Sequence, residues 1–219
     1  MSNRFSALIG RVLPLLFFRN SRQYWETRYR LGGHSGEGSR GEAQLYKTGV
    51  INQFVKDNAI NSVIEFGCGD GQQLRTLHIP HYVGVDVSPT VLSTCRKEFG
   101  DDPSKVFVLL DDYAGQHAEL SMSVDVIFHL VEDNTYDDYL ARLFAAGTRF
   151  VIIYSTSTDL ADTGVSHVRH RNVLADVSAR FPTFRRMTEA EAALPPPVRF
   201  DRGHPTSFFL FEATETAGS

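Results

Sequence analysis

The chain has 219 residues, 42% of them hydrophobic and 22% charged, which is an ordinary composition for one soluble domain with a sizeable core. Its formal net charge of −4 argues against nucleic acid as a partner, because binding to phosphates requires a basic surface. The two cysteines, Cys68 and Cys95, lack the spacing of a metal site, and we expect free thiols in a reducing, cytoplasmic compartment.

The N-terminal segment 7–18 is apolar except for Gly10, Arg11 and Pro14. It is shorter than the ~20 apolar residues that span a bilayer, and no small-residue cleavage site follows it. We expect a helix that packs on the body of the protein or across the interface of a homodimer. Peripheral contact with a membrane surface is the alternative.

Segment 30–41 is rich in glycine and serine, which predicts a flexible loop or a lid. We therefore interpret residues 1–41 as an N-terminal helix and lid segment, and residues 42–219 as the main domain.

From residue 42 onward, helix-like and strand-like stretches alternate along the sequence. The helices expected are 42–58, 71–77, 89–99 and 134–146, and the strands expected are 62–66, 82–86, 106–110, 124–128 and 150–155. This alternation predicts an α/β fold with a mostly parallel sheet and helices on both faces. The weaker pattern after residue 167 predicts a helix at 170–181, a loop at 195–205 and a late antiparallel strand at 206–212.

The strongest local signal is the glycine loop Glu65–Gly71, with the sequence EFGCGDG, directly after the first strand. Glycines permit a tight turn and a close approach of the backbone to a ligand. Asp86 ends the second strand, where a carboxylate can accept hydrogen bonds from two ribose hydroxyls. Gln72 stands where a dinucleotide-binding loop requires glycine, and the Gly-Lys-Ser/Thr ending of a triphosphate loop is absent. A glycine turn that merely connects strand and helix is the remaining alternative.

This loop matches the ExGxGxG motif of class I S-adenosylmethionine (SAM)-dependent methyltransferases. Segments 85–88, 111–112 and 123–133 resemble the second, third and fourth motifs of that family, and the resemblance covers residues 42–155. It implies a Rossmann-like methyltransferase fold, with SAM as methyl donor and S-adenosylhomocysteine (SAH) as product. The cofactor-binding residues that it implies are Trp25, Arg28, Glu65, Gly67, Gly69, Asp86, and Asp111 or Asp112.

Individual roles follow from the same resemblance. Gly67 and Gly69 would contact the methionine moiety, and Asp86 would bind the ribose. One of the acids at 111–112 would accept the adenine amino group, unless both lie on a solvated turn. Trp25 and Arg28 would belong to a segment that folds over the cofactor, with Arg28 near its carboxylate. An aromatic side chain that only anchors a helix is the alternative for Trp25.

Four further segments resemble a bacterial subgroup that methylates sugars and polysaccharide precursors. They are 24–29, the glycine-serine loop, 128–133 and 167–171. The resemblance implies SAM-dependent O-methylation of a sugar or oligosaccharide hydroxyl. The alternatives are methylation of another small molecule at oxygen, nitrogen or sulfur, and a non-catalytic SAM-binding scaffold.

Methyl transfer to a hydroxyl benefits from a group that accepts its proton. His129 follows the fourth predicted strand and is the first candidate, with Glu132 and Asp133 able to orient it; the alternative is that it only shapes the pocket. His167 and His170 would share one face if 167–170 is helical, and could act on the substrate, bind an anion with the neighbouring arginines, or bind a divalent metal.

A metal site known from some relatives has two glutamates and a histidine near the fourth strand. The corresponding residues are Asp125, Phe128 and His129, so one carboxylate position is aromatic and this type of site is in doubt.

Overall fold

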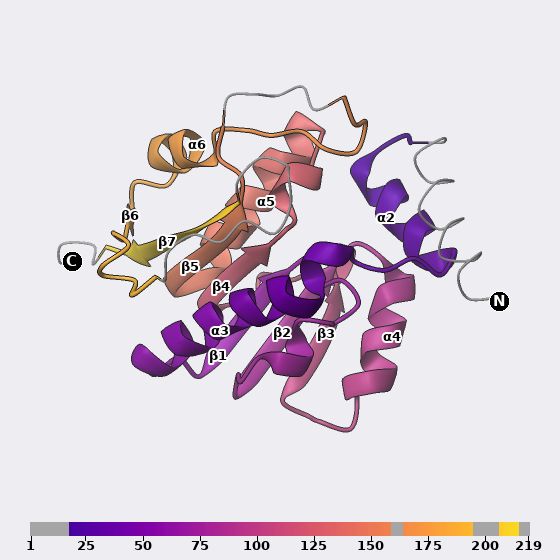
Figure 1. Cartoon of the computed structure of the whole chain (residues 1–219), viewed down its shortest axis with the longest axis horizontal. Helices are drawn as coiled ribbons and strands as arrows, with labels where there is room; N and C mark the ends of the chain where they lie inside the picture. Colours follow the sequence, from indigo (N-terminus) through magenta and orange to yellow (C-terminus); the bar gives the residue numbers. More distant parts are fainter. Residues whose placement is uncertain (1–17, 159–163, 195–205, 215–219) are drawn as a thin grey trace.

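A computed structural model of the chain describes residues 18–158, 164–194 and 206–214 (Figure 1). The expectations for the apolar segment up to residue 17 and for the loop at 195–205 lie outside these residues. No described helix is both long enough and apolar enough to cross a membrane.

A seven-stranded sheet in the order β3-β2-β1-β4-β5-β7-β6 forms the centre of the molecule. Its strands are β1 (Ser62–Phe66), β2 (His81–Asp86), β3 (Lys105–Leu109), β4 (Ala118–Val124), β5 (Gly147–Ser155), β6 (Phe184–Arg186) and β7 (Ser207–Ala213). The pairs among β1 to β5 are parallel, while β7 is antiparallel to both β5 and β6. The expected α/β class, the mostly parallel sheet and the antiparallel late strand are confirmed.

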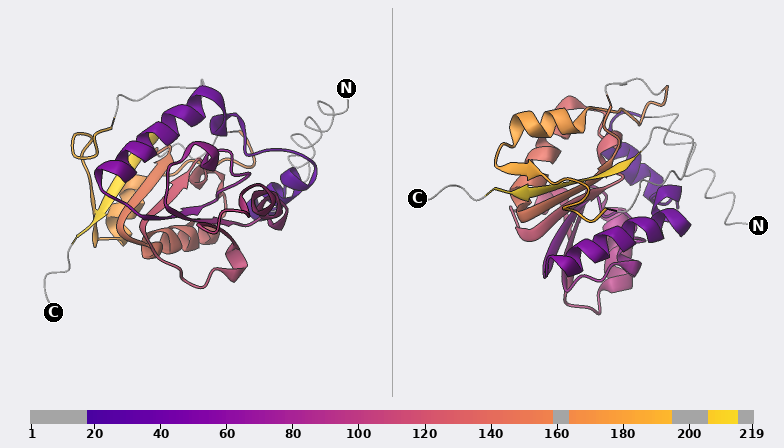
Figure 2. Two further views of the ribbon diagram at one scale, coloured as in Figure 1. Left: turned by 90° about the horizontal axis from the view of Figure 1, so that it is seen from below. Right: turned by 60° about the vertical axis from the view of Figure 1, so that its left-hand side comes forward.

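Helices cover both faces of this sheet (Figures 1 and 2). The apolar sides of α3 (Gly41–Asp57) and α4 (Pro89–Phe99) pack into the core on one face. Those of α5 (Asp133–Ala146) and α6 (Val173–Arg180) pack on the other. Helix α2 (Ser21–Arg30) instead lies beside the N-terminal end of α4, where it contacts the turns that follow the strands.

Local sequence explains where several elements begin. The Ser88 side chain accepts a hydrogen bond from Val91 N, and Pro89 occupies the first helical position, so α4 begins with two favourable capping features. The β1 side chains are buried from Val63 onward, as expected for a central strand covered on both faces. Cys68 and Cys95 are buried free thiols.

Two of the elements predicted around the first and fourth strands differ from the structure. The expected helix 71–77 is only a 3₁₀ turn, Leu74–Thr76, and Gly71, with a φ of +70°, cannot belong to a right-handed helix. The strand expected at 124–128 is β4, which ends at Val124. Its buried serines, Ser121 and Ser123, hydrogen-bond to Leu143 O and the Tyr139 hydroxyl, and these polar residues concealed the strand pattern.

The last predicted helix starts later than expected. Segment 167–172 is irregular, and α6 begins at Val173 after Asn172, whose side chain caps it. Strand β6 and helix α2 were not predicted as separate elements.

Candidate active site

The glycine loop turns sharply after β1. Gly67 and Gly69 have φ of +78° and +57°, a region that side chains disfavour. A Cβ on Gly67 would lie 2.5 Å from Val126 Cγ2, and one on Gly69 would lie 2.3 Å from Ser35 Oγ. Glycine is therefore required at both positions by conformation and by space.

Asp86 lies against this loop at the end of β2. Its Oδ2 accepts a hydrogen bond from Gly69 N at 3.0 Å, and its Oδ1 accepts one from Ser88 N at 2.9 Å. Only 7% of the residue is exposed, and this burial raises the pKa of Asp86 to about 6. The carboxylate thus joins the first two strand ends and presents a negative charge to the space above them.

A cavity of about 270 Å³ lies at this edge of the sheet. The glycine loop and Asp86 form one wall, and Val126 and His129 form another. Trp25 of α2 also lines it. These side chains come from segments that are far apart in sequence, and the carboxyl edge of a parallel sheet is where ligands of α/β proteins bind.

Helix α2 is tied to three turns around the cavity. Ser21 donates from N and Oγ to Glu132 at 2.9 and 2.8 Å. Arg22 Nη1 donates to Asp111 at 2.8 Å. Glu26 accepts hydrogen bonds from the hydroxyls of Ser88 and Thr90. The helix is thereby anchored to the segments after β2, β3 and β4.

These contacts revise the positions expected for two acids. Glu132 binds the first residue of α2 and does not contact His129, so it does not orient the imidazole as expected. Asp111 is exposed and paired with Arg22, which lowers its pKa. Asp112 is also exposed, and Leu110 is the residue of this turn that lines the cavity.

Glu65 and Arg28 lie behind the cavity wall. Glu65 is 2% exposed and accepts a hydrogen bond of 2.5 Å from the Tyr82 hydroxyl; its burial raises its pKa to about 7. Arg28 is buried and donates to His34 O at 2.7 Å and to the Tyr24 hydroxyl at 3.0 Å. Neither residue is among those that line the cavity, and Arg28 instead connects α2 to the glycine-serine loop.

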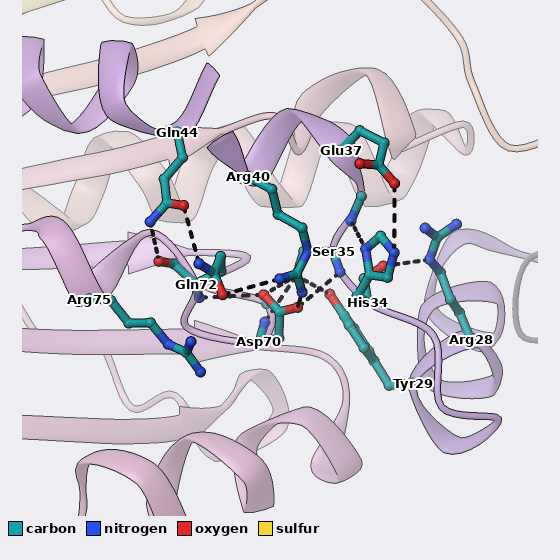
Figure 3. A network of polar contacts seen from close by, with 12 residues as sticks. Arg28, Tyr29, His34, Ser35, Glu37, Arg40, Gln44, Asp70, Gln72 and Arg75 are labelled. Atoms are coloured by element: carbon teal, nitrogen blue, oxygen red, sulfur yellow. Dashed lines mark hydrogen bonds and ion pairs between the residues drawn. The ribbon is translucent and has the colours of Figure 1, made fainter. Parts of the chain in front are cut away.

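The glycine-serine loop folds onto the glycine loop (Figure 3). Ser35 Oγ donates to Asp70 at 2.8 Å and lies 3.0 Å from the Tyr29 hydroxyl. Arg40 Nη2 reaches the other oxygen of Asp70 at 2.9 Å. Asp70 therefore holds this loop against Gly69, a role that its position within the glycine motif does not reveal.

His129 is half-buried in the cavity wall, where Trp25 meets it edge-on at a ring separation of 5.0 Å. Its Nδ1 lies 3.0 Å from His167 O. Because a carbonyl can only accept, Nδ1 must carry the hydrogen and Nε2 the lone pair. Burial lowers the pKa of His129 to about 3, so the ring is neutral at ordinary pH.

Segment 167–171 supports His129 and is not a helical His-x-x-His face. The His167 ring stacks on His129 at 5.6 Å, while His170 is buried and bonded to Thr156 Oγ1 at 2.7 Å. His167 and His170 do not line the cavity. The segment is not helical at 167–170, so the condition under which the two histidines would share one face is not met.

The neighbouring arginines are occupied as well. Arg169 donates to Val131 O and pairs with Asp133, and Arg171 donates to Leu130 O and Val131 O. These bonds hold the turn after β4 in place and engage the charges that were considered for anion binding. Across the described part of the chain, no group of three or more histidine, cysteine or acidic side chains could hold a metal ion.

The sequence interpretation missed Lys47 and the position of Asp125. Lys47 is 1% exposed on the buried side of α3, and its ammonium group pairs with Asp125, which lines the cavity. A lysine at helical spacing from Ala43, Val50 and Phe54 was the available signal, since a charge on an apolar face needs a partner.

Residues 64–152 match the protein family described as "Methyltransferase domain". No curated protein matches the chain. Solved structures with the same fold include the N-methyltransferase NodS from Bradyrhizobium japonicum WM9 in complex with SAH, with a TM-score of 0.65 and 13% identity over 90% of this chain and 100% of that chain. CalS10, an amino pentose methyltransferase from Micromonospora echinaspora, has a TM-score of 0.58 and 12% identity over 87% and 96%. The methyltransferase domain of bacterial CtHen1 has a TM-score of 0.56 and 18% identity over 77% and 98%.

The matched segment contains the glycine loop, Asp86 and the turn that carries His129. The domain match and the site within it make this chain a SAM-dependent methyltransferase.

Proposed function

We propose that this methyltransferase transfers the methyl group to a hydroxyl of a sugar or oligosaccharide, such as a polysaccharide precursor. The main supporting observation is the neutral His129 beside Trp25 in the cavity. The lone pair on Nε2 can accept a hydrogen bond from a hydroxyl. The indole of Trp25 offers a flat apolar face of the kind that packs against the C–H face of a sugar ring.

The cavity fits the donor in shape and charge. Gly67 and Gly69 leave room for a ligand to approach the backbone, and we assign the methionine moiety to them. Asp86 is held by two backbone amides, and we assign the ribose hydroxyls to its carboxylate. When bound, SAM supplies an electrophilic methyl group on a sulfonium.

His129 then acts on the acceptor in two stages. Its low pKa makes it a weak base, so it does not remove the proton from a free hydroxyl. It accepts a hydrogen bond at Nε2 and thereby directs an oxygen lone pair toward the methyl group. As the new C–O bond forms and the methyl–sulfur bond breaks, with its electron pair remaining on sulfur, the oxygen becomes far more acidic, and Nε2 can then take up its proton. His167 positions the ring through its carbonyl and its stacked side chain.

Formation of SAH on a panel of acceptors tests the proposal. Sugars and oligosaccharides with free hydroxyls should support turnover, whereas the matched O-methylated sugars should not. Turnover only with amines or thiols would reassign the enzyme to another small-molecule acceptor. Binding of SAH without turnover on any acceptor would identify a non-catalytic SAM-binding scaffold. CalS10, which has the same fold, is an amino pentose methyltransferase, and this likeness supports the proposal of a sugar acceptor.

We also propose that the enzyme works in the cytoplasm as a homodimer and that segment 7–18 provides the dimer contact or a peripheral membrane contact. The apolar sequence of that segment supports this proposal. Light scattering and flotation with anionic vesicles, comparing the full chain with one that lacks residues 1–19, separate the two roles. A monomer that does not float would contradict both.

A further inference from the structure

A buried ion pair lies beside the cavity. The ammonium group of Lys47 pairs with the carboxylate of Asp125, and it also lies 5.2 Å from the centre of the Tyr154 ring. Lys47 is 1% exposed, so the charge has lost nearly all its water. Burying such a pair brings little net stability, because desolvation offsets the attraction. A role in the site explains its presence better than stabilisation of the fold.

The backbone at Asp125 supports this interpretation. Asp125 has φ of +59°, a left-handed conformation that is uncommon for a residue with a side chain. Its N–H still donates to Tyr154 O at 3.0 Å, so the chain leaves the sheet directly after this bond. Unfavourable backbone conformations of this kind cluster at functional sites. Here the conformation places the carboxylate at the end of β4, in the cavity wall.

The strand order determines which part of the donor Asp125 meets. In the sheet, β2 and β4 flank β1 on opposite sides. Asp86, at the end of β2, is on the nucleoside side of the glycine loop, and Asp125, after β4, is on the other side. A Cβ on Gly38 would lie 3.2 Å from Asp125 Oδ2, so the glycine-serine loop also lies against this carboxylate. A ligand with its ribose at Asp86 therefore extends past Gly67 toward Asp125.

That end of the donor carries an α-carboxylate and an α-ammonium group, and a carboxylate side chain attracts only the ammonium group. We propose that Asp125 binds the α-ammonium group of SAM and SAH, and that Lys47 is a positioning residue that holds the carboxylate. A carboxylate has enough lone pairs to accept from both cations. The inference rests on the use of SAM and not on the identity of the acceptor.

Calorimetry without acceptor tests this directly. The ligands are SAH and its deaminated analogue, in which hydrogen replaces the α-amino group. The wild-type protein should bind SAH at least about tenfold more tightly than the analogue, the scale of one charge-assisted hydrogen bond. The Asp125→Asn variant should bind the two ligands with affinities within about twofold of each other, because the substitution should weaken the binding of SAH and leave that of the analogue unchanged. Asparagine tolerates the left-handed backbone, and its side-chain oxygen can still accept a hydrogen bond from Lys47. The variant loses stability because the buried ammonium group loses its counter-charge, but the comparison of two ligands on the same folded protein does not depend on that loss.

Asp138→Asn is the matched control, because Asp138 is another carboxylate that lines the cavity, from α5. It should keep the wild-type preference for SAH. Equal affinities for the two ligands in the wild-type protein, or an unchanged preference in Asp125→Asn, would overturn the proposal. Failure of the wild-type protein to bind SAH at all would instead contradict the use of SAM. Absence of turnover with sugars would leave this result unaffected.

Discussion

The two sides of the cavity differ in how far apart their residues lie in the sequence. On the donor side, Gly69 and Asp86 are 17 residues apart and meet through consecutive strand ends. The side that we propose for the acceptor comprises His129 and the nearby contact between Glu132 and Ser21. There, Ser21 and Glu132 are 111 residues apart in the sequence, and His129 and His167, which positions it, are 38 residues apart. The donor side is therefore set by local backbone geometry, whereas the acceptor side is assembled by packing between distant segments. Substitutions on the two sides should affect different measurements.

The largest effect should come from the donor side. Gly67→Ala forces a Cβ to within 2.5 Å of Val126 Cγ2 at a φ of +78°. Strain and clash together should weaken SAH binding by roughly 2–5 kcal/mol, measured by calorimetry. Gly49→Ala is the control, since a Cβ there meets nothing within 4 Å and alanine favours a helix. Wild-type affinity in Gly67→Ala would show that the loop does not hold the donor closely.

His129→Ala should separate the two sides. Turnover should fall about 10²-fold, while SAH affinity should change by less than about threefold, because the residue acts on the acceptor. Because the pKa of His129 is about 3, its protonation should not reduce turnover between about pH 6 and 8. Steady-state SAH formation and calorimetry measure both quantities. A loss of affinity equal to the loss of turnover would make His129 only part of the cavity wall.

Asp86→Asn should weaken SAH binding by about 1–3 kcal/mol, because the ribose loses a charged acceptor. In the wild-type protein the affinity should fall as the pH is lowered through about 6, where Asp86 becomes protonated. The variant should lack this part of the pH dependence. Identical pH profiles of the two proteins would argue against a ribose contact.

The same residue predicts a stability effect of opposite direction. Burial raises the pKa of Asp86 from 3.8 to about 6 in the folded protein. The ligand-free protein should therefore lose stability as the pH rises from about 4 to about 6, by at most about 3 kcal/mol. Chemical denaturation at several pH values should show that the stability of Asp86→Asn rises relative to that of the wild-type protein as the pH increases over this range. A constant difference would contradict the raised pKa.

The smallest effect should come from Arg22→Ala, which removes an exposed ion pair with Asp111. We expect less than about 1 kcal/mol of lost stability, and still less at high salt. Thermal unfolding at two salt concentrations measures this. A loss above about 2 kcal/mol would show that this pair carries more of the attachment of α2 than Glu26 and Glu132 do.

The sequence predicted the glycine loop and Asp86 better than the rest of the site, because their signals are local. The glycine loop and the placement of Asp86 at a strand end depend on neighbouring residues, and the structure has both as expected. Glu132 could not be assigned in this way, because its partner, Ser21, belongs to a helix that the pattern did not reveal. Likewise, the position of His167 and His170 depends on contacts with Phe128–Val131 and Thr156 rather than on helical spacing.

Helix α2 also sets a limit on which changes the enzyme can accept. Its anchors at Ser21, Arg22 and Glu26 span six residues, and the five rises between the first and the last cover about 7.5 Å along the helix axis. Inserting one residue between Arg22 and Glu26 would rotate Glu26 by about 100° away from α4 while leaving the first anchors in place. In homologous enzymes with this arrangement, the outward-facing residues of α2 should therefore vary freely, whereas the number of residues between those anchors should stay constant.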